Sequence, residues 1–153
     1  MRQKIKSAAL ESDRKQCGSS AAGAESATVL LVDDDPLVRS LVLDMLKEAG
    51  YLVLEAAGPG EALRQCERHR GPIHLLLTDV QMPAMNGCQL AEVVKAARKE
   101  TKVLLMTGYA DETMLRYGVQ TLGAVCIRKP FLPDSLLSTV QTVLGIGAAA
   151  SRA

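Results

Sequence analysis

Short apolar runs and one-sided apolar stripes alternate along the chain from Thr28 onward. Five runs are apolar almost throughout, and most of them end in polar or charged residues: TVLLVD, YLVLEA, IHLLLTD, KVLLMT and AVCIRK. Strands without a polar face are typical of a sheet that is buried on both sides. We therefore expect five strands of this buried kind.

Between these runs, apolar residues recur at spacings of three and four, which predicts helices. The first helix carries apolar residues from Leu37 to Leu46, and Gly50 is expected to stop it. The remaining helices are expected near residues 59–70, 87–98, 111–122 and 132–144. The helix at 111–122 is predicted to be the weakest, because Gly118 lies inside it.

Five strand–helix repeats predict an α/β fold, a doubly wound five-stranded parallel sheet with helices on both faces. Residues 1–27 lack the pattern and are polar and rich in Ala, Ser and Gly, so they are expected to form a flexible linker or tail. One domain is then expected over residues 28–145, followed by a short tail at 146–153.

The composition changes this picture little. The net charge is +1, from 18 basic and 17 acidic residues, which gives no general reason to expect binding to nucleic acid or membrane surfaces. No apolar run approaches the ~20 residues of a membrane span, and no signal peptide pattern is present, so a cytoplasmic location is predicted. The four cysteines have no C-x-x-C spacing and are expected to be reduced thiols.

Polar side chains follow several of the predicted strands. Asp33 and Asp34 end the first strand, Asp79 ends the third, Thr107 the fourth and Lys129 the fifth. The ligand site of a parallel sheet lies beyond the carboxyl ends of its strands. Carboxylates from two strands, a hydroxyl from a third and an ammonium from a fourth are therefore expected to converge on one edge.

Clustered carboxylates need compensation if they are all to stay ionised. Mg²⁺ suits such a site, because it prefers oxygen ligands and binds through one or two carboxylates plus a phosphate. Lys129 is expected to hold a phosphate oxygen, and Thr107 to donate a hydrogen bond to another. The set is typical of phosphoryl transfer to an aspartate.

Four stretches, VLLVDDDPLVR, LLLTDVQMPAMNG, VLLMTGYA and IRKPF, resemble in this order the receiver domains of two-component response regulators. The resemblance covers about residues 28–145. The chain also looks like the C-terminal receiver of a hybrid histidine kinase, and two interpretations stay open: such a module by itself, or a free single-domain regulator. The resemblance implies a flavodoxin-like (βα)5 fold with strand order 2-1-3-4-5. It also implies a signalling module that catalyses only its own phosphoryl acceptance and autodephosphorylation, rather than an enzyme with other substrates.

The resemblance assigns roles by position. Asp79 would be the phosphoacceptor, and Thr107 and Lys129 would bind the phosphoryl group. Asp34 would bind the metal directly, and Asp33 directly or through water. The full set of metal ligands implied is Asp33, Asp34, Asp79 and the main-chain carbonyl of Gln81. The Lys129–Pro130 peptide bond is implied to be cis.

The partners implied are a histidine kinase or a histidine phosphotransfer protein. A homodimer through the fourth helix, the fifth strand and the fifth helix is a further expectation. One position departs from the family pattern, because Cys126 stands where many receivers carry a switch Tyr or Phe. Tyr109 is the nearest aromatic residue, and two interpretations stay open for it: a gate over the site, or a partly exposed loop tyrosine.

Two other functions compete with this one. The first is a phosphatase of the haloacid dehalogenase type, whose D-x-D motif Asp33 and Asp35 resemble. Against it, Leu37 stands where that motif has Thr or Val, and Asp35 before Pro36 is better explained as a helix cap. The second is a pseudo-receiver, an interaction module that works without phosphorylation, which the intact set of acids, Thr107 and Lys129 disfavours.

Overall fold

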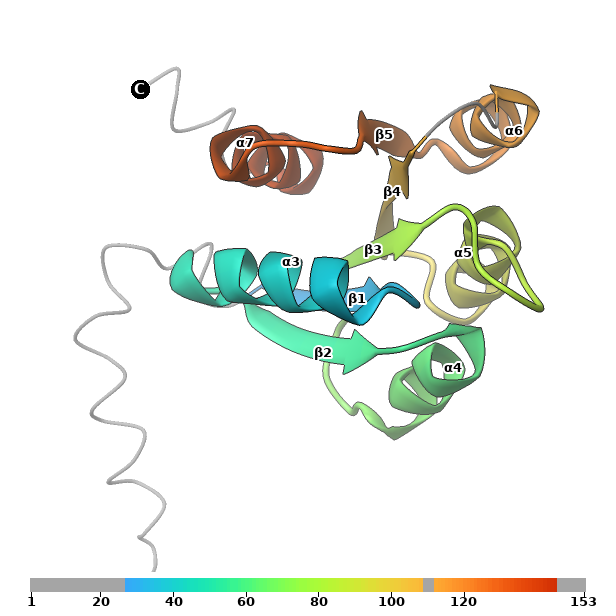
Figure 1. The fold of residues 1–153 in the computed structure, drawn as a ribbon. Coiled ribbons are helices and arrows are strands. Elements are labelled where there is room, and N and C mark those ends of the chain that lie inside the picture. The colour runs from blue at the N-terminus through green and yellow to red at the C-terminus, as the bar shows by residue number, and fades with distance from the viewer. Residues whose placement is uncertain (1–26, 109–111, 146–153) are drawn as a thin grey trace, which may run out of the picture.

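The structure is a computed structural model that describes residues 27–108 and 112–145, and strands and helices alternate along it as predicted (Figure 1). The strands are β1 (Thr28–Val32), β2 (Leu52–Ala56), β3 (Leu75–Asp79), β4 (Lys102–Thr107) and β5 (Val125–Arg128). The helices are α3 (Pro36–Glu48), α4 (Pro59–Arg68), α5 (Gly87–Ala97), α6 (Glu112–Leu122) and α7 (Pro133–Leu144).

The strands form one parallel sheet in the order β2-β1-β3-β4-β5, which confirms the predicted topology. The direction of winding reverses between β1 and β3, which are neighbours in the sheet. In such sheets the crevice beyond the carboxyl ends of the strands at the reversal is the usual ligand site. The acids that end β1 and β3 therefore lie at this point of the fold.

Alternate residues of each strand face two separate cores. Leu30 and Leu76 belong to the core that α4 and α5 cover, whereas Leu31 and Leu77 belong to the core that α3 and α7 cover. All four side chains are fully buried. The view in Figure 1 shows the same two layers, with α3 and α7 on one side of the sheet and α4 and α5 on the other. The prediction of a sheet buried on both faces is confirmed.

Local sequence explains where several helices begin. Proline stands at the start of α3, α4 and α7, where its missing N–H costs nothing and its fixed φ suits a helix. The Asp35 carboxylate accepts hydrogen bonds from the N–H groups of Leu37 and Val38, at 3.0 and 3.5 Å, so the predicted cap of α3 is confirmed. Asn86 and Gln89 form a reciprocal capping box at the start of α5.

Two predicted boundaries shift because of hydrogen bonds made at the ends of helices. Gly50 (φ 98°) ends α3 as expected, but the Tyr51 N–H donates to the Leu46 carbonyl, so β2 begins only at Leu52. Helix α4 ends at Arg68 rather than near residue 70. The Arg98 guanidinium, from the end of α5, donates to main-chain carbonyls of residues 66, 69 and 71, so these carbonyls are hydrogen-bonded although the helix does not continue.

Gly118 has a packing role that its sequence position does not reveal. A Cβ atom at this residue would lie 2.8 Å from Leu105 Cδ1 and 3.3 Å from Cys88 Sγ. Glycine therefore allows α6 to approach β4 and α5 closely. The sequence prediction treated Gly118 only as a weak point of the helix. The structure adds that its missing side chain leaves room for Leu105 and Cys88 to lie against α6.

The predicted C-terminal tail and the predicted N-terminal linker, except Ala27, lie outside the described residues. Ala27 itself is buried, and its carbonyl accepts a hydrogen bond from the Leu52 N–H at 3.0 Å. Cys66 and Cys126 are free thiols, and Cys88 is a buried residue in the first turn of α5. None of the helices in the described ranges is long and apolar enough to cross a bilayer.

Candidate functional site

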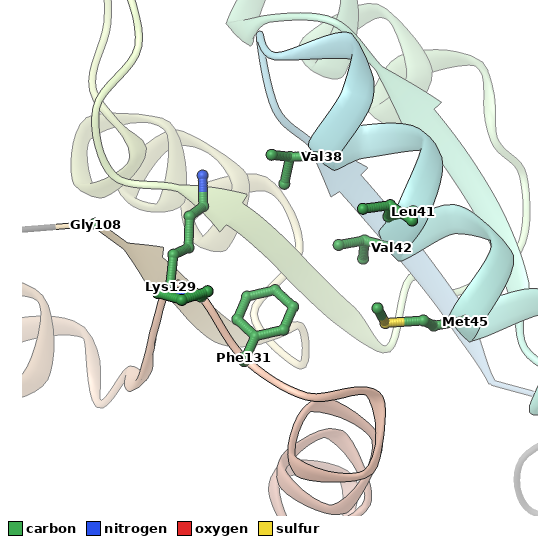
Figure 2. A pocket seen from close by; sticks show the side chains of 8 residues that line it. Val38, Leu41, Val42, Met45, Gly108, Lys129 and Phe131 are labelled. Atoms are coloured by element: carbon green, nitrogen blue, oxygen red, sulfur yellow. The ribbon is translucent and has the colours of Figure 1, made fainter.

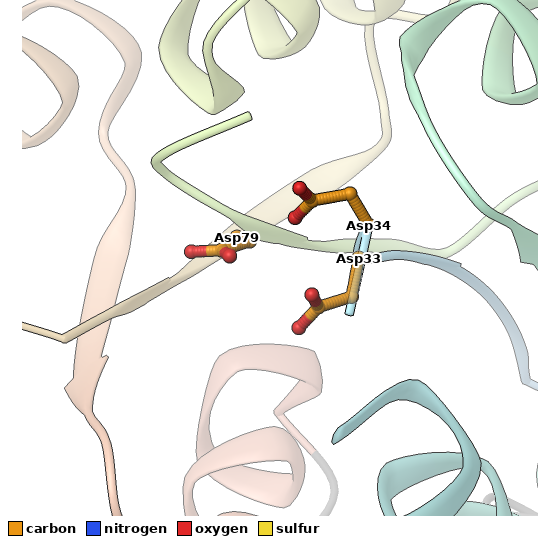
Figure 3. Close-up of side chains that lie close together, drawn as sticks. All are labelled: Asp33, Asp34 and Asp79. Carbon is orange, nitrogen blue, oxygen red and sulfur yellow. The ribbon is translucent and has the colours of Figure 1, made fainter. Parts of the chain in front are cut away.

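Three carboxylates meet at the carboxyl edge of the sheet (Figure 3). Asp33 and Asp34 follow β1 and Asp79 ends β3, and one oxygen from each lies within 4.8 Å of the others. Asp33 is fully buried and Asp79 is 8% exposed, whereas Asp34 is exposed to solvent. The sequence prediction that the acids of two strands converge is confirmed in its geometry.

The Lys129 ammonium lies between two of these carboxylates. Its Nζ atom is 3.2 Å from Asp79 Oδ2 and 3.3 Å from Asp33 Oδ2. Lys129 directly follows β5, and its main-chain N–H donates to the Thr107 carbonyl at 2.7 Å. The bond from Lys129 to Pro130 is cis, as the resemblance implied. The ammonium is thus fixed at the same edge of the sheet as the acids.

Burial and the neighbouring charges shift the pKa values of Asp79 and Lys129. Burial raises the pKa of Asp79, the Lys129 ammonium opposes that shift, and the Asp33 carboxylate adds to it. For Lys129, burial acts to lower the pKa, but the Asp33 and Asp79 carboxylates outweigh burial and the pKa is raised. Burial therefore sets the direction of the pKa shift at Asp79, and the two carboxylates set it at Lys129.

The donor set fits a hard divalent cation. Three carboxylates and one ammonium leave two negative charges at the site when all are ionised, which one divalent ion would balance. No hydrogen bond or ion pair joins the Asp34 side chain to another described residue, so its oxygens are available for coordination. Oxygen ligands from one or two carboxylates beside open solvent are what Mg²⁺ prefers.

The loop after β1 is held by hydrogen bonds that side chains make with its main chain. The Asp35 N–H donates to Asp33 Oδ1 at 2.9 Å, and the Arg39 guanidinium donates through Nη1 to the Asp33 carbonyl at 2.7 Å. Arg39 also donates through Nε to Glu55 Oε2 at 3.0 Å. Sequence reasoning missed the pair Arg39 and Glu55, because their contact forms only when α3 packs against β2.

Asp35 takes no part in the acidic cluster. It is exposed, and its carboxylate caps α3. The second acid of the D-x-D pattern is therefore engaged elsewhere, and the cluster pairs Asp33 and Asp34 with Asp79 from another strand. This arrangement favours the receiver interpretation over a phosphatase of the haloacid dehalogenase type.

The loop after β3 shapes the surroundings of Asp79. The Gln81 N–H donates to Asp79 Oδ1 at 3.3 Å, and the Gly87 N–H donates to the Val80 carbonyl at 2.8 Å. A Cβ atom at Gly87 would lie 2.3 Å from the Asp79 carbonyl oxygen, so only glycine allows α5 to begin this close to the acceptor strand. Ala84, between them, has a positive φ of 74°.

Of the other predicted site residues, the structure describes Thr107 and Cys126 but not Tyr109. Thr107 ends β4 with 2% exposure and pairs in register with Arg128, so it lies at the same edge. Cys126 is half-buried in the core beneath the site, in register with Leu105, and burial raises the pKa of its thiol. Tyr109 lies outside the described residues, and both interpretations of it stay predictions.

An apolar cavity of about 390 Å³ lies beside the site, between α3 and the segment after β5 (Figure 2). Its walls are side chains of α3 together with Pro130 and Phe131, and the Phe131 ring faces the helix. Lys129 and Gly108 form the wall nearest the acids. The charged cluster therefore has an apolar neighbour on its α3 side.

Comparison with known proteins identifies the family of this chain. Residues 29–141 match the family model described as the response regulator receiver domain. The sensor kinase CckA of Brucella abortus is 34% identical over 119 residues, which are 78% of this chain and 13% of the kinase. The probable chemotaxis protein CheY of Rhizobium etli is 27% identical over 124 residues, which are 80% of this chain and 95% of that protein.

A solved structure shows the same fold. The crystal structure of the receiver domain from the hybrid histidine kinase CckA aligns with a TM-score of 0.65 at 31% identity, and covers 77% of this chain and 99% of that domain. The chain spans only 13% of the length of the first relative, so it corresponds to one part of that larger kinase. The chain belongs to the family of response regulator receiver domains, which act in two-component and phosphorelay signalling.

Proposed function

We propose that this receiver domain accepts a phosphoryl group on Asp79 in a Mg²⁺-dependent reaction and thereby changes a surface that binds other proteins. The observation that carries the proposal is the meeting of three carboxylates with Lys129 at the winding reversal of the sheet. Membership of the receiver family supports the same function. The only catalysis proposed is phosphoryl acceptance and later hydrolysis at this one residue.

The chemistry is an in-line displacement at phosphorus. A carboxylate oxygen of Asp79 attacks the phosphorus of the donor, and the bond from phosphorus to the donor breaks, with its electron pair leaving on the donor. Mg²⁺, held by Asp33, Asp34, Asp79 and the Gln81 carbonyl, would supply neutralisation of the charge on the phosphoryl oxygens. Hydrolysis by water then returns the carboxylate and releases inorganic phosphate.

Lys129 and Thr107 have roles that follow from their positions. Without a phosphoryl group, the Lys129 ammonium contacts the carboxylates of Asp33 and Asp79. After transfer, it can move to a phosphoryl oxygen, and the Thr107 hydroxyl can donate to another. The two residues already share a main-chain hydrogen bond at 2.7 Å, so a shift of either is passed to the ends of β4 and β5.

The output is proposed to be a population shift. Contacts from the phosphoryl group to Thr107 and Lys129 favour one arrangement of the loop after β4 and of the face formed by α6, β5 and α7. Tyr117, Val119 and Val125 expose apolar surface on α6 and β5, which supports a protein contact there, including the expected homodimer. Coupling through Cys126 in place of an aromatic ring is part of the same proposal.

The proposed phosphoryl donors are a histidine kinase or a histidine phosphotransfer protein. Similarity to a sensor kinase, CckA, and to the sporulation initiation phosphotransferase F of Bacillus subtilis supports this class of partner. The cytoplasmic location, and the absence of nucleic-acid binding and membrane insertion, stay predictions from composition. The boundaries of the linker and tail also stay predictions.

The function is tested by the mass of the intact protein after incubation with acetyl phosphate. The expected result is one added phosphoryl group that requires Mg²⁺, disappears with a chelator and is absent from Asp79→Asn. Asp35→Asn is the matched control, because Asp35 is an exposed acid of the same loop that only caps α3. No adduct on the wild type would favour the pseudo-receiver, and release of phosphate from many unrelated monoesters would favour the phosphatase.

A further inference from the structure

The Arg39 side chain links the loop after β1 to the neighbouring strand β2 without a hydrogen bond to any carboxylate of the cluster. Arg39, on α3, donates through Nη1 to the main-chain carbonyl of Asp33 at 2.7 Å and through Nε to Glu55 Oε2 at 3.0 Å. The Arg39 side chain is only 18% exposed. Glu55 lies in β2, and Gln65 of α4 donates to its carbonyl at 3.0 Å, so the anchor for Arg39 is itself fixed.

The carbonyl that Arg39 holds belongs to the peptide group between Asp33 and Asp34. A peptide group is planar, so fixing its oxygen fixes the direction in which the chain enters Asp34. The carboxylates of Asp33 and Asp79 are each held by Lys129 and by a main-chain N–H. The Asp34 carboxylate has no such contact with any other residue in the described ranges.

We propose that Arg39, anchored by Glu55, is a positioning residue that aims the Asp34 carboxylate at the Mg²⁺ site. This inference rests on the proposed function, because it concerns the affinity of the same site for Mg²⁺. Arg39 binds neither the metal nor the phosphoryl group. It acts through the peptide plane, and Glu55 keeps its guanidinium in the one orientation that reaches the Asp33 carbonyl.

The sign of the effect separates positioning from simple electrostatics. A positive charge beside a cation site weakens cation binding. If Arg39 acted through its charge alone, its loss would therefore raise the affinity for Mg²⁺. If Arg39 acts by positioning Asp34, its loss would lower the affinity for Mg²⁺, because Asp34 would no longer be directed into the cluster. If Arg39 only joined α3 to β2, its loss would lower the stability of the fold and leave the affinity for Mg²⁺ unchanged.

Lysine at this position keeps the charge but not the geometry. An ammonium is a point donor, whereas a guanidinium donates along fixed directions to two acceptors at once. Arg39→Lys therefore keeps the electrostatic contribution and loses the paired contact with the Asp33 carbonyl and Glu55. Both Arg39→Lys and Arg39→Met are expected to weaken Mg²⁺ binding, although only Arg39→Met removes a charge.

The test is a calorimetric titration of the metal-free full chain with MgCl₂. Loss of a group that orients a metal ligand typically costs about 10–100-fold in metal affinity, and we expect a loss of about 10-fold for Arg39→Met and somewhat less for Arg39→Lys. Arg68→Met is the control for charge, because Arg68 is exposed in the last turn of α4 and no hydrogen bond or ion pair joins it to another described residue. It should bind Mg²⁺ like the wild type.

A second measurement needs no metal. Backbone ¹⁵N relaxation in the metal-free protein should show greater mobility at Asp34 in both Arg39 variants, with the amides of β1 unchanged.

Wild-type binding of Mg²⁺ together with unchanged or tighter binding by both variants would overturn the inference and leave the proposed function standing. A wild type that binds no Mg²⁺ would overturn the proposed function, and the inference with it. If Arg39→Met fails to fold, Arg39→Lys decides by the same criteria.

Discussion

Gly87 offers the sharpest test of the backbone geometry around the acceptor strand. Substitution by alanine would place a Cβ atom 2.3 Å from the Asp79 carbonyl oxygen and 3.0 Å from both the Asp79 carbonyl carbon and Val80 Cα. Carbon and oxygen normally approach no closer than about 3.3 Å, so the start of α5 and the end of β3 must separate by about 1 Å. All three atoms belong to the backbone and cannot rotate away.

The expected cost follows from measured effects of overpacking. Forcing an extra methyl group into a packed interior destabilises proteins by about 1–3 kcal/mol. For a domain of this size, each kcal/mol corresponds to about 4 °C in Tm, so Gly87→Ala should lower Tm by about 4–12 °C. The displaced Asp79 carbonyl should also weaken Mg²⁺ binding, because the acceptor carboxylate moves with its backbone.

Gly60→Ala is a matched control with the opposite expected sign. Gly60 also lies in the first turn of a helix, but a Cβ atom there would meet only Arg64 Nη1, at 3.8 Å. Replacing an unstrained helical glycine by alanine stabilises by about 0.4–1 kcal/mol. Thermal unfolding followed by circular dichroism measures both variants. A Gly87→Ala protein as stable as the wild type, or stabilised like Gly60→Ala, would refute the close contact with Asp79.

Three further predictions concern stability. Burial places the folded-state pKa of Asp79 above its unfolded value, so the contribution of this group to stability is present in acid and is lost as the pH rises through the folded pKa. Asp79→Asn should therefore stabilise the metal-free protein at neutral pH, and this gain in the free energy of unfolding should disappear at acid pH. Urea titrations at both pH values measure it, and an equal gain at both would contradict the prediction. Asp35→Ala should cost about 1 kcal/mol by loss of the α3 cap, and a change of zero in urea unfolding would show that the cap contributes nothing. Leu76→Ala should cost about 2–5 kcal/mol, because Leu76 is fully buried in β3, and thermal unfolding close to that of the wild type would contradict the packing.

The fold was predictable because its signals are local. Continuous apolar runs predicted buried strands, helical spacing predicted the elements between them, and parallel strands must end at a common edge. That last constraint placed Asp33, Asp79, Thr107 and Lys129 together without any knowledge of tertiary contacts. The resemblance then supplied the strand order, which the structure confirms.

The features that sequence reasoning missed depend on the distance between elements. Arg39 meets Glu55 only because α3 packs against β2, and the pair looks like two ordinary charged residues in the sequence. Gly118 looks like a helix breaker, but its role is to let α6 approach Leu105. Arg98 ends a helix at one point of the chain and satisfies carbonyls about thirty residues earlier. No periodicity or motif reports such contacts.

The most direct test of the central claim is the position of the phosphoryl group in the chain. The protein is incubated with acetyl phosphate and Mg²⁺, reduced with sodium borohydride, which converts an aspartyl phosphate to homoserine, and sequenced by tandem mass spectrometry. The account predicts homoserine at residue 79 and aspartate retained at Asp33 and Asp34. Homoserine at Asp33 or Asp34, or no conversion of a protein that has gained a phosphoryl group, would contradict it.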